Sequence, residues 1–349
     1  MTRDRYLDLV RVFCVLKVVV VHWLTARVWE GGGQIGAVSI VDSMPWLGVF
    51  GWLAVSSPAL LFVGGMINHS TCTKYGPRAF LLKRVKRLLA PLAFFAAVWV
   101  AVELVLHVLD VGGSGLWRWV GWRGVLPFGP LWFIGVYLIL VALTPVTTRL
   151  TDRFGLAVPL AFCGATAGID VVRFVFDVPL VGWLNLVLAW LVPHTLGHCR
   201  ISGQRTAVLL MVGGLAALLG LTATGWYPAA VGGGPGFPFS NMSPPTVCIA
   251  ALGVLQAGLV LLCRPAGAAV LAWRWADTAV RRLNGCTMTI YLWHMTAVLL
   301  AVLLLASFGV ADNASSGKDW VAQRPLWFVV DAVCLVLLVL VFRPVERIR

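Results

Sequence analysis

The chain has 349 residues, of which 60% are hydrophobic and only 12% are charged. A soluble domain of this length carries about 25% charged residues, so the composition excludes an ordinary soluble protein. The net charge of +13 is typical of nucleic-acid-binding proteins, but here the basic residues gather on alternate connections between long apolar runs. That distribution orients a chain in a lipid bilayer, and we expect no nucleic-acid partner.

Apolar runs of about 18 to 23 residues recur along the whole chain, each long enough to cross a hydrocarbon layer of about 30 Å as a helix. With the N-terminus inside, most Lys and Arg residues fall on the inner connections. We therefore predict an all-α integral membrane protein with about ten transmembrane helices, both termini cytoplasmic, multi-pass in the cell membrane. We expect a single domain over residues 1–349. The predicted spans are 7–28, 46–68, 88–109, 131–148, 156–173, 180–197, 207–225, 246–263, 285–307 and 325–342.

The first predicted span carries four polar side chains, namely Asp8, Arg11, Lys17 and His22. A charged side chain near the bilayer centre costs about 2.5 to 3.5 kcal/mol on insertion scales, so such residues are functional candidates. Arg11 and His22 are eleven residues apart, just over three helical turns, and share one face about 16 Å apart along the axis. Asp8 lies one turn before Arg11, where an ion pair is available.

That spacing suits a long anionic donor that enters from the cytoplasm. Arg11 would meet its phosphates, and His22 would act as general base on an acceptor hydroxyl. The alternative is that His22 is a buried structural histidine bonded to a neighbouring helix. Lys17 lies on another face and needs a partner, for which Glu103 and Asp331 are both candidates.

A basic cluster precedes the third predicted span and includes Lys83, Arg84 and Arg87. Arg84 and Arg87 are three residues apart and share a helical face. Two guanidinium groups side by side suit bidentate binding of phosphate. The competing interpretation is anchoring to anionic lipid head groups.

Weaker candidates for substrate binding come from other spans. The stretch TIYLWHM at 289–295 places Tyr291 and His294 three residues apart, and the remaining candidates are Glu103, His107 and Trp132. The eight cysteines form no C-x-x-C pair, so we expect neither a zinc site nor a disulfide framework. We also expect no other metal site and no permanently bound cofactor.

Together these motifs resemble the acyltransferase 3 family of integral membrane acyltransferases, in an actinobacterial style. The matching elements, in chain order, are an R-x10-H pattern (Arg11, His22) with Asp8 before it, an R-x-x-R pattern (Arg84, Arg87), PLWFIGVYLILVALTP at 130–145 and IYLWHM at 290–295.

The resemblance implies transfer of an acyl group, commonly acetyl, from cytoplasmic acyl-CoA to a hydroxyl of a surface glycan or a natural product such as a macrolide. It implies that His22 is the catalytic base, that Asp8 and Arg11 belong to the catalytic residues, and that Asp8 orients Arg11. It also implies that Arg11, Arg84, Arg87 and the neighbouring Lys83 bind the donor. Many members carry an additional SGNH-type hydrolase domain, which this sequence lacks, so we expect the reaction in the membrane portion or with a separate partner.

Two other functions stay open at this point. A proton-coupled transporter would use Asp8, His22, Glu103 and His107 as a path, and would be expected to show repeated halves with helices broken near the midplane. A lipid- or isoprenoid-converting enzyme, such as a cyclase, would use the same arginines to bind a diphosphate and an Asp or His to supply the proton.

Overall fold

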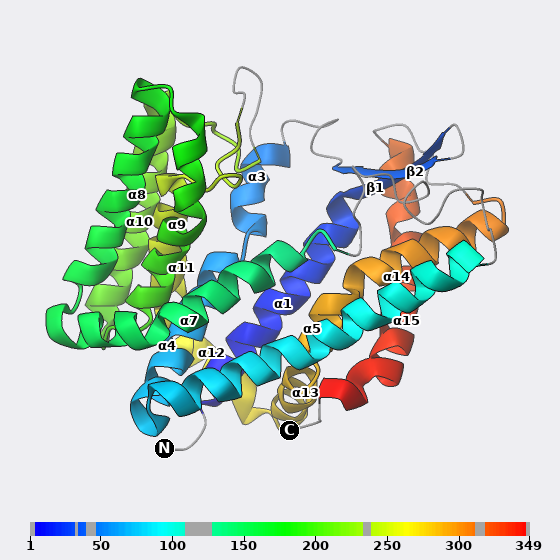
Figure 1. The fold of residues 1–349 in the computed structure, drawn as a ribbon, viewed down its shortest axis with the longest axis horizontal. Coiled ribbons are helices and arrows are strands. Elements are labelled where there is room, and N and C mark those ends of the chain that lie inside the picture. The colour runs from blue at the N-terminus through cyan, green and yellow to red at the C-terminus, as the bar shows by residue number, and fades with distance from the viewer. Residues whose placement is uncertain are drawn as a thin grey trace. The chain divides into compact units, whose positions relative to one another are not determined.

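The computed structural model describes residues 4–31, 34–39, 47–108, 128–232, 239–310 and 318–346. Within these ranges the chain is helical apart from one antiparallel hairpin and short connections. The all-α class is therefore confirmed. Figure 1 shows the elements, which are α1 (Arg5–Thr25), β1 (Ala26–Gly31), β2 (Gln34–Ser39), α3 (Leu47–Ala54), α4 (Ser57–Tyr75), α5 (Pro77–Val108), α7 (Leu131–Phe154), α8 (Ala157–Val175), η1 (Pro179–Leu184), α9 (Asn185–Leu196), α10 (Gln204–Ala223), α11 (Val247–Leu262), α12 (Arg264–Ala272), α13 (Arg274–Asn284), α14 (Thr287–Ser307) and α15 (Lys318–Glu346).

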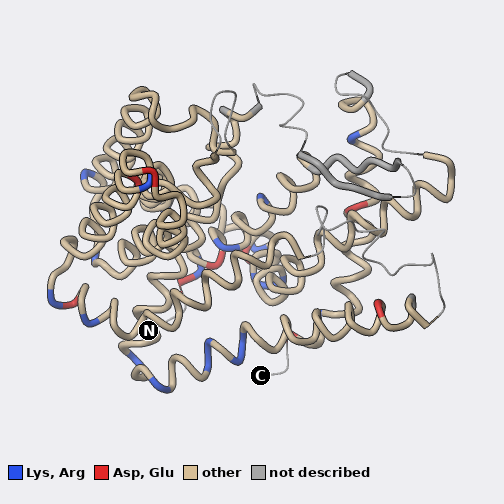
Figure 2. The backbone as a smooth tube through the Cα atoms, turned by 45° about the horizontal axis from the view of Figure 1, so that its top comes forward, with Lys and Arg blue, Asp and Glu red and all other residues tan. Residues whose placement is uncertain are grey.

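Eight helical segments in the described part of the chain are long and apolar enough to cross a membrane, or up to nine if the bent pair α11–α12 is one span. The two helices of that pair meet at 47°. The first predicted span coincides with α1, which has 21 residues but carries Arg5, Asp8, Arg11 and Lys17 and is therefore less apolar than the others. Long uncharged stretches of the tube in Figure 2 show how few Lys, Arg, Asp or Glu residues interrupt the helices. The protein is a multi-pass membrane protein.

Several boundaries differ from the sequence prediction, and two of them bear on the predicted site. The first span was predicted to reach residue 28, but α1 ends at Thr25 and the chain continues into the hairpin, where Arg27 pairs with Val38. From Ala26 to Gly31 the backbone pairs with Gln34–Ser39, and this pairing takes the place of further helical hydrogen bonds. In contrast, α5 begins at Pro77, eleven residues before the predicted span, because proline fits the first turn of a helix. The basic cluster therefore lies within α5.

The helices form two compact units, each described by itself. Unit 1 comprises Met1–Cys14, Trp46–Val85 and Gly135–Asn284, and unit 2 comprises Val15–Pro45, Lys86–Ile134 and Gly285–Arg349. The helices α1, α5 and α7 contribute to both. The expectation of one domain over the whole chain stays a prediction.

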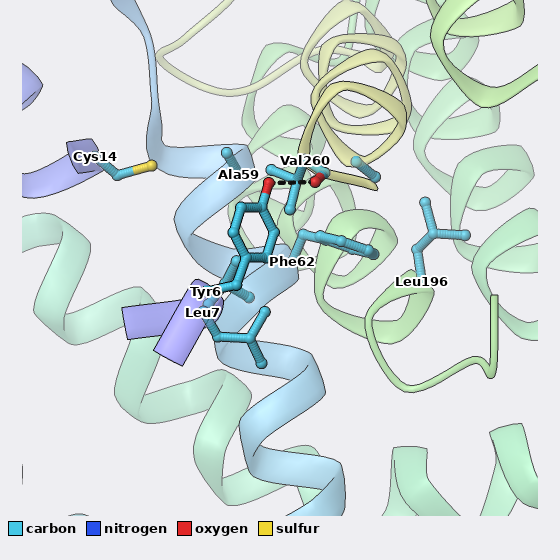
Figure 3. Close-up of a cluster of buried hydrophobic side chains, with 9 residues drawn as sticks. Tyr6, Leu7, Cys14, Ala59, Phe62, Leu196 and Val260 are labelled. Atoms are coloured by element: carbon cyan, nitrogen blue, oxygen red, sulfur yellow. Dashed lines mark hydrogen bonds between the residues drawn. The ribbon is translucent and has the colours of Figure 1, made fainter. Parts of the chain in front are cut away.

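The N-terminal end of α1 is fixed within unit 1 by a buried apolar cluster. Tyr6 and Leu7 pack with Phe62 of α4, Leu196 of α9 and Val260 of α11. The Tyr6 hydroxyl donates a hydrogen bond to the Val260 carbonyl oxygen, as Figure 3 shows. The Tyr6 ring and its apolar neighbours thus anchor the start of α1, the helix that carries the predicted site.

Unit 2 is built around α14, which packs against α15. The Trp293 ring of α14 stacks on Phe342 of α15 with centroids 3.9 Å apart, and meets Phe95 of α5 edge-on at 5.0 Å. At the start of α14, the Glu346 carboxylate accepts hydrogen bonds from the backbone and hydroxyl of Thr289. These contacts satisfy amides that a helix start leaves unpaired and hold α14 in place.

Candidate active site

A pair of histidines from α1 and α14 lies in contact within unit 2, and we call it the histidine pair. His22 Nδ1 lies 2.8 Å from His294 Nε2, which is hydrogen-bond distance. The two rings are nearly parallel, with an interplanar angle of 9° and centroids 5.0 Å apart. The sequence identified each histidine as a separate candidate, and the structure brings them together.

Further hydrogen bonds hold the buried member of the pair. His294 is fully buried, and its Nδ1 lies 2.6 Å from the carbonyl oxygen of Tyr291, one turn earlier in α14. The indole Nε1 of Trp23, next to His22 in α1, donates to the His294 carbonyl oxygen at 3.2 Å. The Tyr291 hydroxyl in turn donates to the Pro130 carbonyl oxygen. The buried ring therefore sits in a fixed frame, whereas His22 is only half-buried.

Asp8 lies at the other end of α1, in unit 1, and is nearly fully buried. Its carboxylate accepts hydrogen bonds from the guanidinium of Arg5 at 2.8 Å and from the side-chain amide of Asn284 at 2.9 Å. Arg5 also pairs with Asp277 at 3.0 Å. These partners fasten the start of α1 to α13. The predicted role of Asp8 in orienting Arg11, which is half-buried on the same helix, stays a prediction.

The basic cluster lies along the first half of α5. Arg84 is half-buried, with Nη2 3.5 Å from the Thr71 hydroxyl of α4, and its guanidinium lies 6.0 Å from the Phe80 ring centroid. Lys83 and Arg87 are exposed. Lys83 and Arg84 belong to unit 1 and Arg87 to unit 2, so their joint action on one phosphate-bearing donor stays a prediction.

Comparison with protein families decides the class of this chain. A family model described as an acyltransferase domain, acyltransferase 3, matches residues 4–343. The chain belongs to the acyltransferase 3 family. It is an acyltransferase-type enzyme, and the resemblance carried by the motifs is confirmed at the level of the family. Neither a curated protein nor a solved structure matches this acyltransferase.

The weaker candidates of the acyltransferase occupy different surroundings. Tyr291 lies beside His294 and contacts the ring of Phe133 at 6.0 Å. Trp132 is exposed, and so is His107. Glu103 of α5 is half-buried, and one of its carboxylate oxygens is enclosed without a hydrogen-bond partner. Of these candidates, the described contacts associate only Tyr291 with the histidine pair.

Lys17 of α1 lies in the same unit as both of its predicted partners. Its side chain is half-buried on α1 within unit 2. Both carboxylates considered from the sequence, Glu103 of α5 and Asp331 of α15, belong to the same unit. The choice between them stays open.

The sequence singled out His194 only as a weaker polar candidate, but the structure places it in a second set of histidines in unit 1. We call this set the histidine group: His69 of α4 with His194 and His198 at the end of α9. The His198 ring centroid lies 4.8 Å from that of His194 and 5.4 Å from that of His69. His194 Nε2 lies 3.3 Å from the side-chain amide of Asn68, and His69 Nε2 lies 2.9 Å from Asp152. The i, i+4 spacing of His194 and His198 was the signal that could have found it.

The histidine group invites the question of a metal ion. Among the residues that the structure describes, no three or more His, Cys, Asp or Glu side chains are arranged so that they could hold one.

Proposed function

We propose that the protein is a membrane-bound O-acyltransferase of the cell membrane. It moves an acyl group, with acetyl as the expected one, from cytoplasmic acyl-CoA to a hydroxyl of a surface glycan or a hydroxylated natural product. The observation that carries the proposal is the histidine pair, in which a half-buried imidazole is held by a fully buried one, in a chain of the acyltransferase 3 family.

His22 acts as the general base in this proposal. It removes the proton from the acceptor hydroxyl while that oxygen attacks the carbonyl carbon of the thioester. The tetrahedral intermediate then breaks its carbon–sulfur bond, and the protonated His22 returns the proton to the departing sulfur. The products are an ester and CoA, and the imidazole is neutral again. Every proton is accounted for without a permanently bound cofactor.

The basic residues bind the donor in this proposal. CoA carries phosphate groups, and arginine guanidinium groups bind phosphate through two parallel hydrogen bonds. Arg11, Arg84 and Arg87 supply such groups, and Lys83 adds an ammonium charge beside them. Asp8 has a supporting role, since its hydrogen bonds to Arg5 and Asn284 fix the start of the helix that carries Arg11.

The test uses the full chain purified in detergent with acetyl-CoA and a panel of sugars and hydroxylated natural products. Free CoA is measured with a thiol reagent, and products are identified by mass spectrometry. We expect acetyl-CoA-dependent CoA release that falls by about 10²- to 10⁴-fold in His22→Ala, the usual contribution of a general base. The matched control is His69→Ala, a histidine of unit 1, which should retain its turnover.

Three outcomes would contradict the proposal. Unchanged turnover in His22→Ala would reject His22 as the base. A lipid or isoprenoid product formed without CoA release would favour the converting enzyme. Substrate flux in proteoliposomes without any acyl-CoA would favour the transporter.

A further inference from the structure

We infer that His294 is a positioning residue that holds His22 in the one tautomer whose lone pair is at Nε2. The inference concerns the histidine pair and rests on the proposed function of His22 as base. It assigns to His294 a defined task in place of general substrate binding.

The carbonyl oxygen of Tyr291 fixes the position of the proton on the buried ring of His294. His294 Nδ1 lies 2.6 Å from the Tyr291 carbonyl oxygen. A carbonyl oxygen carries no hydrogen and can only accept, so Nδ1 of His294 must donate. A neutral imidazole has one N–H and one lone pair, and the lone pair of His294 is therefore at Nε2.

The hydrogen bond between the two rings then fixes the position of the proton on His22. His294 Nε2 and His22 Nδ1 are 2.8 Å apart, a distance that requires one hydrogen between them. Because His294 Nε2 supplies the lone pair, His22 Nδ1 supplies the hydrogen. The remaining nitrogen of neutral His22, Nε2, then carries the lone pair that can take a proton from a hydroxyl.

The same hydrogen bond persists through the reaction. When His22 accepts a proton at Nε2, its Nδ1–H still donates to His294 Nε2, so neither ring has to turn. A carboxylate performs this task for the histidine of serine hydrolases, whereas here a neutral imidazole backed by a backbone carbonyl performs it. Both rings cannot be protonated in this arrangement, since two N–H groups would then face each other.

The surroundings assign the two histidines to different tasks. His294 is fully buried, while His22 is half-buried, so His294 acts through His22. Trp23 ties the backbone of α14 to α1 through its bond to the His294 carbonyl oxygen. Stacking of Trp293 on Phe342 restrains the neighbouring position of α14. A ring held on this many sides can fix the orientation of a partner ring.

The test compares two substitutions of His294 in the full chain, with acetyl-CoA as donor and CoA release as readout. His294→Leu keeps much of the volume but has no acceptor, and His294→Gln places an amide oxygen close to the former Nε2. We expect His294→Leu to lower kcat by about 10- to 100-fold, as loss of an orienting partner does. The KM for acetyl-CoA should change by less than about twofold, and His294→Gln should restore most of kcat.

A double variant completes the test. Turnover of His22→Ala/His294→Leu should equal that of His22→Ala alone, because His294 has no task once His22 is gone. Melting temperatures identify any variant that has lost its fold. Normal kcat in folded His294→Leu would overturn the inference, as would equal losses in the Leu and Gln variants or an additive loss in the double variant. Absence of acetyl-CoA-dependent turnover in the unaltered protein would instead overturn the proposed function itself.

Discussion

The two units each contain buried histidines, but the ring nitrogens of those histidines are used differently. In the histidine pair of unit 2, hydrogen bonds lead from a backbone carbonyl through His294 to the half-buried ring of His22. In the histidine group of unit 1, His194 is fully buried, and its Nδ1 has no hydrogen-bond partner. In the same group, His69 Nε2 contacts the exposed carboxylate of Asp152.

Under the proposed function, burial alone does not distinguish the general base from the buried histidines of the histidine group. A general base needs a defined lone pair, and the hydrogen bond between His22 and His294 provides one. The histidine group lies instead where α4 and α9 approach each other closely. We therefore expect its contacts to affect the stability of the fold, so that the two groups can be separated by experiment.

The largest expected effect is on turnover, and it distinguishes a loss of catalysis from a loss of stability. We expect His22→Gln to lower turnover per folded molecule by about 10²- to 10⁴-fold with little change in melting temperature. His198→Gln should do the reverse, changing the melting temperature while leaving the turnover of the folded fraction within about twofold. Both are measured with acetyl-CoA on the same detergent-purified preparations. Equal loss of turnover in the two variants would remove the distinction between the groups.

The next effect concerns the close approach of α4 and α9. A Cβ added at Gly65 would lie 2.0 Å from the backbone oxygen of His194, so one helix must move. We expect Gly65→Ala to destabilise the fold by about 1 to 3 kcal/mol, the usual cost of overpacking. Gly164→Ala in α8 is the control, because nothing lies within 4 Å of an added Cβ there.

The control should be neutral or stabilising by about 0.5 to 1 kcal/mol, as alanine replaces glycine inside a helix. Chemical denaturation in detergent provides the measurement. If Gly65→Ala were as stable as Gly164→Ala, the tight contact that holds the histidine group would not exist.

Helix periodicity predicted which residues share a face, but not which face meets which helix. The run at 285–307 gave α14 nearly to the residue, because long apolar runs form helices in a bilayer. It could not pair His294 with His22, since the two are 272 residues apart in the chain. For Asp8, periodicity allowed a partner one turn away in either direction. The sequence predicted Arg11, one turn later, as the partner of Asp8. The structure shows an ion pair between Asp8 and Arg5, one turn earlier.

A smaller effect is expected in the pH dependence of stability. His198 lies just beyond α9, and burial, with the nearby His194 and His69 rings, lowers its pKa to about 2, against the opposing effects of a backbone hydrogen bond with Thr147 and of the Asp152 carboxylate. The unfolded chain binds this proton near pH 6.5, so between these values the unfolded state holds more protons. Stability therefore decreases as pH falls below about 6.5, by up to about 1.4 kcal/mol per pH unit.

Replacing the buried imidazole should remove this acid sensitivity. His198→Gln is expected to flatten the decline in melting temperature between about pH 6.5 and 4.5. The exposed His107 is the control, and His107→Gln should leave the slope unchanged. A slope as steep in His198→Gln as in the unaltered protein would show that the His198 imidazole does not cause the acid sensitivity.

The smallest effect compares two tryptophans that each donate to a backbone carbonyl, one in each unit. Trp23 donates to His294 at 3.2 Å, and Trp52 of α3 donates to Ala229 at 2.7 Å. Replacement by Phe removes one hydrogen bond in each case, with an expected loss of stability of about 0.5 to 1.5 kcal/mol. Only Trp23→Phe should also lower kcat, by about two- to threefold, because the freed His294 backbone orients its ring less well. Equal kcat values in the two variants would show that the frame around the histidine pair contributes to folding alone, and that the hydrogen bond between the two rings is sufficient to orient His22.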